Sequence, residues 1–330
     1  MGGGRVLVTV SICTWNRARL LRETLLRMTE LVIPAGVEWE LLVVDNNSTD
    51  DTPIVLRDFM SRLPLRCVAE LRPGVSNARN TAVAEARGTY MLCTDDDVLV
   101  DKHWLETYVE AFERHSDAVV FGGPILPWFE GEPPGWLRAV FSKVDAAYAA
   151  RVFAEGDQPL SDTAMAFGAN MAIRTDVLRN HPFDVALGRV EGSLLGGEET
   201  AMIRAILATG AKGWWVSAAR VQHYIPRARQ STGYLRQWYA GYGRTLVRLD
   251  AKSSAANNRR RPRWIWRELV VSELRFRVRR IWAPPWVWID DLKRASTARG
   301  QFEEFGALNR SAADTPARKL HNQADWRRLS

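Results

Sequence analysis

Apolar and polar residues alternate in blocks along the first half of the chain, and the blocks follow two different periods. Short continuous apolar runs are typical of buried strands, whereas apolar residues three or four positions apart are typical of helices that cover a sheet. The blocks predict a repeated order of strand, helix and strand. The predicted strands are residues 5–13, 39–45, 65–71, 88–97 and 118–125, and the predicted helices are residues 17–31, 52–63 and 76–87.

This alternation predicts an α/β fold in which a mostly parallel central sheet is flanked by helices on both faces. Polar clusters follow three of the strands, with the sequences CTWNR at 13–17, DNNSTDD at 45–51 and TDDD at 94–97. Ligands of such sheets bind beyond the carboxyl ends of the strands. The three clusters are therefore expected to converge on one crevice.

The second half of the chain has a less regular pattern. Residues 127–141 are rich in Trp, Pro and Gly, which predicts an irregular loop. Its tryptophans Trp128 and Trp136 are expected to be exposed, and a loop of this kind near a site is a candidate lid or acceptor platform. The remaining predicted elements are a strand leading into a helix at 167–179, a helix at 196–210 and a single last strand at 213–225.

Asp95, Asp96 and Asp97 directly follow the apolar part of the fourth predicted strand, and three adjacent carboxylates repel one another. A bound cation or a set of hydrogen-bond donors relieves this repulsion. The alternative is an exposed loop in which Asp97 or Asp101 caps the helix that follows. Convergence with the other two polar clusters favours the cation site.

Composition limits the class of protein. The 330 residues are enough for one large α/β domain with an appendage, and 46% hydrophobic and 25% charged residues are typical of globular proteins. Cys13, Cys67 and Cys93 are far apart, which predicts buried thiols in a reducing compartment. The sequence has no recognisable secretion or N-terminal acylation signal and no run of 18 apolar residues, so a cytoplasmic protein without a spanning helix is expected.

Positive charge is concentrated at the end of the chain. From Ala251 onward there are 18 Lys and Arg against 8 Asp and Glu, whereas the preceding residues have 27 against 30. Nine arginines and five tryptophans lie within 259–288. A helix with Trp and aliphatic residues on one side and Arg on the other suits the interface of an anionic bilayer. The alternatives are a helix packed on the preceding domain and a nucleic-acid surface, although no nucleic-acid partner is expected.

Seven short sequences occur in this order along the chain: VSICTWNR, LLVVDNNSTDDT, GVSNARN, CTDDDV, GANMAIR, GGEET and VQHYIPRARQSTGYLRQW. With these motifs the chain resembles glycosyltransferase family 2 over about residues 5–245. Members of that family are inverting enzymes with a GT-A fold, built on a Rossmann-like sheet, that move a sugar from a nucleotide donor. The resemblance implies a catalytic GT-A domain at 1–245. Residues 246–330 are then expected to be a helical, basic, Trp-rich extension that associates with a membrane.

The resemblance also implies a divalent metal, Mn²⁺ or Mg²⁺, because the diphosphate leaving group develops negative charge as the glycosidic bond breaks. By likeness to the family's Asp-x-Asp motif, Asp97 is expected to bind the metal and Asp95 the ribose or a metal-bound water. The run of three leaves the register open, since Asp96 could replace either. His223 is expected to be a metal ligand or a diphosphate contact, with a structural histidine as the alternative.

Further residues are expected from the resemblance to hold the nucleotide donor. Asp45 matches an acid that accepts hydrogen bonds from the base or ribose, or it is a turn carboxylate. Arg79 offers a charge-assisted fork to the diphosphate, or it is only a surface ion-pair partner. The other expected donor residues are Thr14 and Asn16, which could equally cap a helix, together with Arg17, Asn77 and Arg229.

Direct inversion requires one general base that takes the proton of the acceptor hydroxyl. The family places this base in an acidic pair at a helix start, and the motif GGEET offers Glu198 and Glu199. Glu199 aligns with the family's usual Asp and is longer by one methylene. The alternative is that both acids only complement the helix dipole.

The expected activity is metal-dependent, inverting transfer of one sugar to a lipid-linked or polysaccharide acceptor at the cytoplasmic face of a membrane. The segment YLRQWYAGYGR differs from the Gln-x-x-Arg-Trp motif of processive synthases, so addition of a single sugar is expected. One alternative is a sugar-nucleotide pyrophosphorylase, which would need a glycine-rich phosphate loop that CTWNR lacks. The other is a non-catalytic binding protein on a nucleotide fold, against which Asp95, Asp97 and Glu199 argue.

Overall fold

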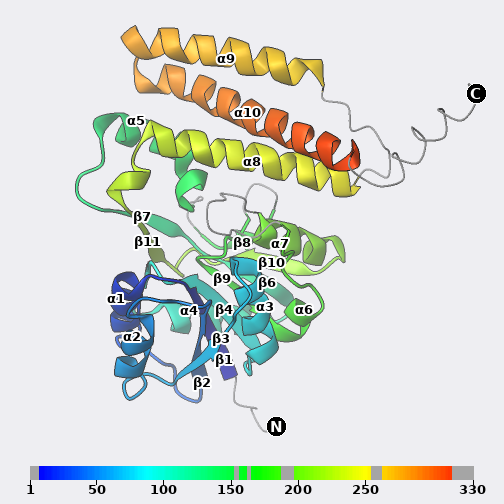
Figure 1. Cartoon of the computed structure of the whole chain (residues 1–330). Coiled ribbons are helices and arrows are strands. Elements are labelled where there is room, and N and C mark those ends of the chain that lie inside the picture. Colours follow the sequence, from blue (N-terminus) through cyan, green and yellow to red (C-terminus); the bar gives the residue numbers. More distant parts are fainter. Residues whose placement is uncertain (1–6, 152–155, 162–164, 187–196, 254–261, 314–330) are drawn as a thin grey trace, which may run out of the picture. The chain divides into compact units, whose positions relative to one another are not determined.

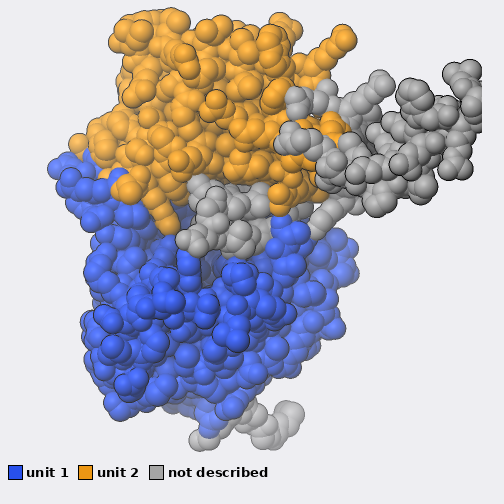
Figure 2. Space-filling view, in the orientation of Figure 1, with its two compact units in different colours: residues 1–133, 144–227 blue, residues 134–143, 228–330 orange. Residues whose placement is uncertain are grey.

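The strands and helices of the first half form in the predicted order in the computed structural model (Figure 1). The structure describes residues 7–151, 156–161, 165–186, 197–253 and 262–313. The chain divides into two compact units: unit 1 is residues 1–133 with 144–227, and unit 2 is residues 134–143 with 228–330 (Figure 2). The predicted boundary at residue 245 lies inside helix α8 (Thr232–Ser253), and a functional division at that residue stays a prediction.

Unit 1 is built on a mostly parallel sheet, as predicted. Its strands are β1 (Leu7–Thr14), β2 (Glu38–Asp45), β3 (Leu65–Ala69), β4 (Tyr90–Asp95), β6 (Ala118–Gly122), β8 (Gln158–Pro159), β9 (Met171–Arg174) and β10 (Lys212–Trp215). Their order is β3-β2-β1-β4-β9-β6-β10-β8. The strand β9 runs antiparallel to β4 and β6, and β8 runs antiparallel to β10.

Helices cover both faces of the sheet because the central strands are continuous apolar runs whose successive side chains point to opposite faces. In β2, Leu41 and Val43 belong to one buried cluster, whereas Leu42 and Val44 belong to another. Each such aliphatic side chain stabilises the fold by about 1.5–3 kcal/mol when fully buried. The helices of unit 1 are α1 (Ala18–Met28), α2 (Thr52–Phe59), α3 (Val75–Glu85), α4 (Trp104–Arg114), α6 (Thr175–Arg179) and α7 (Glu198–Ala208), with a short 3-10 turn at Asp145–Tyr148. Another 3-10 turn, Arg227–Arg229, lies where the chain passes from unit 1 to unit 2.

The prediction of one strand at 213–225 is wrong. The segment forms β10 and then β11 (Val221–Ile225), which belongs to a second sheet with β5 (Val98–Val100) and β7 (Ile125–Phe129) in the order β5-β11-β7. Between β10 and β11 the chain turns, and the amide of Ala219 donates to the carbonyl of Val216. Both residues of this turn are buried, so the apolar pattern continues through it and conceals the break.

The prediction of an irregular loop at 127–141 is also wrong. Its beginning lies in β7, and its end lies in helix α5 (Gly135–Val144). The two prolines at 133–134 precede the helix rather than interrupt it, a position at which proline is tolerated. Leu137, Val140 and Val144 are buried at helical spacing and give α5 one apolar face.

The three cysteines are free thiols. Cys93 in β4 is buried as predicted, whereas Cys13 and Cys67 are half-buried. The prediction of buried thiols is wrong for these two because Cys67 lies in the edge strand β3 and Cys13 lies next to the carboxyl end of β1.

Unit 2 is helical, as predicted for the end of the chain. Helix α10 (Pro285–Ala313) packs against both α8 and α9 (Arg263–Trp282). Gly243 of α8 and Gly300 of α10 permit this close approach, because a Cβ at either position would collide with the backbone of the facing helix. Among the described helices, none combines the length and apolar character needed to cross a bilayer.

Candidate active site

The parallel register of β1, β2 and β4 brings the three predicted polar clusters to one edge of the central sheet. Thr14 at the end of β1 lies opposite Asp45 of β2, and Cys13 lies opposite Asp95 of β4. Neighbouring strands are only about 4.8 Å apart. The predicted convergence of these clusters is therefore confirmed.

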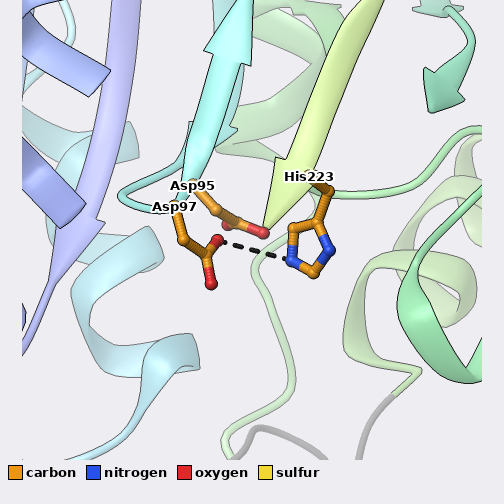
Figure 3. A group of neighbouring side chains, drawn as sticks. All are labelled: Asp95, Asp97 and His223. Atoms are coloured by element: carbon orange, nitrogen blue, oxygen red, sulfur yellow. Dashed lines mark ion pairs between the residues drawn. The ribbon is translucent and has the colours of Figure 1, made fainter. Parts of the chain in front are cut away.

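Asp95, Asp97 and His223 form the group drawn in Figure 3. Asp95 ends β4, Asp97 follows in the turn to β5, and His223 lies in β11, where it pairs with Val98 of β5. One ligand atom of each residue lies within 4.8 Å of the others, and His223 Nε2 is 3.4 Å from Asp97 Oδ1. Asp97 and His223 are buried, so this group lies in a site of low solvent access.

The chemistry of this group fits a divalent cation. Two adjacent ligands of one octahedral ion, each about 2.1 Å from it, lie about 3 Å apart. The 3.4 Å between His223 Nε2 and Asp97 Oδ1 is close to this spacing, and the 4.8 Å limit for the other pairs allows it after a small adjustment. Carboxylate oxygens suit both Mn²⁺ and Mg²⁺, and the imidazole nitrogen favours a transition-metal ion such as Mn²⁺, because Mg²⁺ prefers oxygen ligands alone.

Asp96 is not part of this group and is bonded elsewhere. Its Oδ2 accepts a hydrogen bond from Thr14 Oγ1 at 2.8 Å, and its Oδ1 accepts one from Arg17 Nη1 at 2.9 Å. Arg17 also donates to Asp97 Oδ2 at 2.7 Å. Burial raises the pKa of Asp96 to about 7, against the lowering effect of the Arg17 charge. The geometry thus separates Asp96 from the pair Asp95 and Asp97.

Asn16 joins the loops that follow β1 and β2. Its backbone is left-handed (φ 52°), its Oδ1 accepts a hydrogen bond from the amide of Thr49 at 2.7 Å, and its own amide donates to Ser48 Oγ at 3.0 Å. Asp45 Oδ1 accepts from the amide of Ser48 at 2.9 Å, the bond expected of a turn carboxylate. Asp45 is only half-buried, so a ligand can still reach this side chain.

Asn46 is a buried residue that sequence reasoning missed. Its side-chain amide donates to the carbonyl oxygens of Glu70 and Arg72, both at 2.7 Å, and its Oδ1 accepts from the amide of Gly74 at 2.9 Å. These bonds fix the loop that leads into α3. An Asn that follows a strand is also common in ordinary turns, so the sequence alone does not reveal this role.

Arg79 of α3 connects the carboxylate group to the acidic pair. Its Nη1 lies 2.7 Å from Glu198 Oε1 and 3.8 Å from Glu199 Oε2, and its Nη2 lies 3.5 Å from Asp95 Oδ1. Burial lowers the pKa of Arg79, but the neighbouring carboxylates, first Glu198, raise it further, so the guanidinium stays charged. A Cβ on Gly168 would collide with this guanidinium. Arg79 is buried, so the alternative of a surface ion pair is wrong.

The two glutamates of the acidic pair have different environments. Both lie in the first turn of α7, directly after Gly197 with its left-handed φ of 99°, so both also complement the helix dipole. The side chain of Glu198 is 5% exposed and is bound to Arg79, whereas that of Glu199 is 20% exposed and lies farther from the same arginine. Glu199 is therefore the more accessible carboxylate.

Four predicted residues lie outside this cluster. Asn77 of α3 is half-buried and donates a hydrogen bond to the carbonyl oxygen of Pro73 in the loop before the helix. Trp128 in β7 and Trp136 in α5 are half-buried rather than exposed as predicted, because each packs against another aromatic ring. Trp136 and Arg229 belong to unit 2. The expected roles of all four with donor or acceptor stay predictions.

The sequence matches the family model described as Glycosyl transferase family 2 over residues 9–181, more than half of the chain. The chain is 27% identical over 250 residues to the glucosyl-dolichyl phosphate glucuronosyltransferase of Haloferax volcanii, covering 73% of this chain and 77% of the relative. It is 24% identical over 251 residues to the succinoglycan biosynthesis protein ExoM of Rhizobium meliloti, covering 75% and 76%.

Solved structures confirm the predicted GT-A fold. The mannosyltransferase PcManGT from Pyrobaculum calidifontis, in complex with GDP-Man and Mn²⁺, superposes with a TM-score of 0.53 at 20% identity over 99% of this chain and 81% of that chain. The S. aureus protein TarS in complex with UDP-GlcNAc gives a TM-score of 0.52 at 15% identity, over 92% of each chain. The family match ends before Glu198, Glu199 and His223, so the family model does not test the roles expected for these three.

Proposed function

Because this chain belongs to glycosyl transferase family 2 and is a glycosyltransferase, we propose that it moves one sugar from a nucleotide-diphosphate sugar to a hydroxyl of a lipid-linked or polysaccharide acceptor. The transfer inverts the anomeric carbon and depends on a divalent cation. The observation that carries the proposal is the group Asp95, Asp97 and His223 at the strand ends, joined through Arg79 to the acidic pair. Membership of this family sets aside the nucleotidyltransferase and non-catalytic alternatives.

Asp97 and His223 would hold the cation, with Asp95 as third ligand or ribose contact. The cation would neutralise charge on the departing diphosphate, and Mn²⁺ is the first choice because one donor is an imidazole. The Mn²⁺ in the structure of PcManGT supports this assignment. Arg17 lies beside Asp96 and Asp97 with its side chain 36% exposed, which suits a contact to the diphosphate.

Glu199 is the general base in this proposal. As the acceptor oxygen forms its bond to the anomeric carbon, the hydroxyl proton passes to the Glu199 carboxylate, and the electrons of the breaking glycosidic bond go to the diphosphate oxygen. Glu198 is fixed by its ion pair with buried Arg79 and would lose that pair if it accepted the proton. Arg79 then acts as a positioning residue that holds the acidic pair next to Asp95.

The acceptor class is supported by the two relatives. One is named for a glucosyl-dolichyl phosphate acceptor and the other for succinoglycan synthesis. A lipid-linked or polysaccharide precursor is therefore proposed, with the protein bound peripherally at the cytoplasmic face of a membrane. The cationic C-terminal helices support that location.

A thermal-shift panel of UDP, GDP, dTDP and CMP, each with Mn²⁺ or with EDTA, tests the donor site. We expect one nucleoside diphosphate to raise Tm with Mn²⁺ and to lose this effect in EDTA and in the variant Asp97→Ala. The control is Asp58→Ala, which removes an exposed carboxylate paired only at the surface with Arg22. Equal shifts in Asp97→Ala and the control, or shifts that survive EDTA, would contradict the metal assignment.

A further inference from the structure

Helix α9 has two apolar faces on opposite sides. Ile265, Ser272 and Phe276 are buried, and the Phe276 ring lies 5.7 Å from the ring of Trp288 in α10. At 3.6 residues per turn, a second row lies roughly opposite to these residues. This row, the outer stripe, consists of Val270, Leu274, Val278 and Ile281, at spacings of four, four and three.

Within the part of the chain that the structure describes, most of the outer stripe is uncovered, since only Val270 is half-buried. Leu274 is 58% exposed, Val278 57% and Ile281 85%. Trp282 and Trp286, at the end of α9 and the start of α10, are 72% and 56% exposed. A contiguous apolar surface of this kind usually marks an interaction site, because water contact with so many large apolar side chains is unfavourable.

Several arginines of α9 have no ion-pair partner among the described residues. Arg263, Arg267 and Arg275 are exposed and make no ion pair with any residue that the structure describes. In contrast, Arg277 and Arg279 of the same helix are bound to Glu273 and Asp291. Long arginine side chains can keep their charge at headgroup depth while their stems lie along apolar surface. The free charges therefore suit an anionic ligand surface beside the stripe.

We propose that the outer stripe of α9, with Trp282 and Trp286, lies in the interface of an anionic lipid bilayer, parallel to the membrane plane. The inference rests on the proposed membrane location of the acceptor and names the surface that reaches it. A 20-residue helix could span a bilayer by length, but its arginines recur every few residues and restrict it to the interface.

Two other occupants fit this surface less well. A second copy of the chain, packed stripe to stripe about a twofold axis, would bring the same arginines of the two copies together. A nucleic acid would use the arginines but would leave the aliphatic residues of the outer stripe without a role. Only a lipid surface offers acyl chains and negative charge side by side.

Co-sedimentation of the full-length protein with vesicles tests the inference. The probe is phosphatidylcholine vesicles with and without 30% phosphatidylglycerol, a composition chosen as roughly that of an anionic membrane. We expect binding to the anionic vesicles, and at least a tenfold loss of binding in the double variant Leu274→Glu/Ile281→Glu. The matched control Leu26→Glu/Ile54→Glu changes the same residue types at exposed positions of α1 and α2 in unit 1. It should bind as the wild type does.

Several results would overturn the inference. These are absence of binding by the wild type, equal loss in the two double variants, and sedimentation velocity that shows a wild-type dimer converted to a monomer by Leu274→Glu/Ile281→Glu. The same samples are measured with nucleoside diphosphate and Mn²⁺ by thermal shift. If Leu274→Glu/Ile281→Glu loses vesicle binding but keeps the nucleotide-dependent rise in Tm, the proposed membrane surface is supported. If the wild type binds vesicles but shows no nucleotide-dependent rise in Tm, the proposed donor site is contradicted and the membrane surface is not.

Discussion

Charged side chains are buried and paired at the strand ends of unit 1, but mostly exposed on the basic helix α9 of unit 2. In unit 1, Asp96, Asp97, Arg79 and Glu198 are buried and bonded to one another or to polar side chains. In α9, most arginines are exposed, and several form no ion pair with a described residue. A buried charge is tolerated only when it is paired, whereas exposed charges contribute little to folding. The stability of the buried cluster therefore depends on the exact positions of its charges. The binding proposed for α9 depends instead on total charge and apolar area.

The largest expected effect distinguishes the two members of the acidic pair. Glu199→Gln should lower kcat by about 10²–10⁴-fold because it removes the general base, while the thermal shift with nucleoside diphosphate and Mn²⁺ stays unchanged. Glycosyl transfer and the shift are measured on the same preparations. Full transfer activity in Glu199→Gln would move the base to Glu198.

The second effect concerns buried pairing. Arg79→Met keeps most of the side-chain volume but leaves Glu198 and Asp95 without their counter-charge, so the free energy of unfolding should fall by about 3–5 kcal/mol. The comparison variant is Arg22→Met, which breaks an exposed pair with Asp58 and should cost about 0–1 kcal/mol. Urea denaturation measures both, and equal stability of the two variants would show that the buried cluster is not held by Arg79.

The smallest effect is expected on α9. Arg267→Gln should weaken binding to anionic vesicles about fivefold, the equivalent of roughly 1 kcal/mol per basic residue near the surface, and should leave Tm unchanged. Arg57→Gln on α2 is the control, because Arg57 is also exposed and lies in unit 1. If 150 mM added salt weakens vesicle binding more than the substitution does, binding depends on total charge rather than on this one arginine. A lower Tm in Arg267→Gln would instead show that this arginine stabilises the fold.

Elements with a clear apolar period were predicted correctly, and elements whose local pattern has two meanings were not. The central strands and the helices α1, α2 and α3 have periodic apolar residues, and these elements were predicted correctly from the sequence. Both errors came from local patterns with two meanings. Prolines that looked like breakers at 133–134 stand just before a helix, and an apolar run at 213–225 conceals a turn between strands of different sheets.

The sequence by itself determined the α/β alternation, the polar strand ends and the acidic run, because each depends on neighbouring residues and on fixed backbone periods. Only the tertiary structure decided that β11 pairs with β5 and brings His223 to Asp97, that Arg79 is buried against Glu198, and that Asp96 bonds to Thr14 and Arg17 instead. Likewise, the periodicity of α9 contains two apolar rows, and only packing against α10 shows which row is left outside. These outcomes depend on contacts between residues far apart in the chain. The energy of such contacts is determined by burial and not by the local sequence.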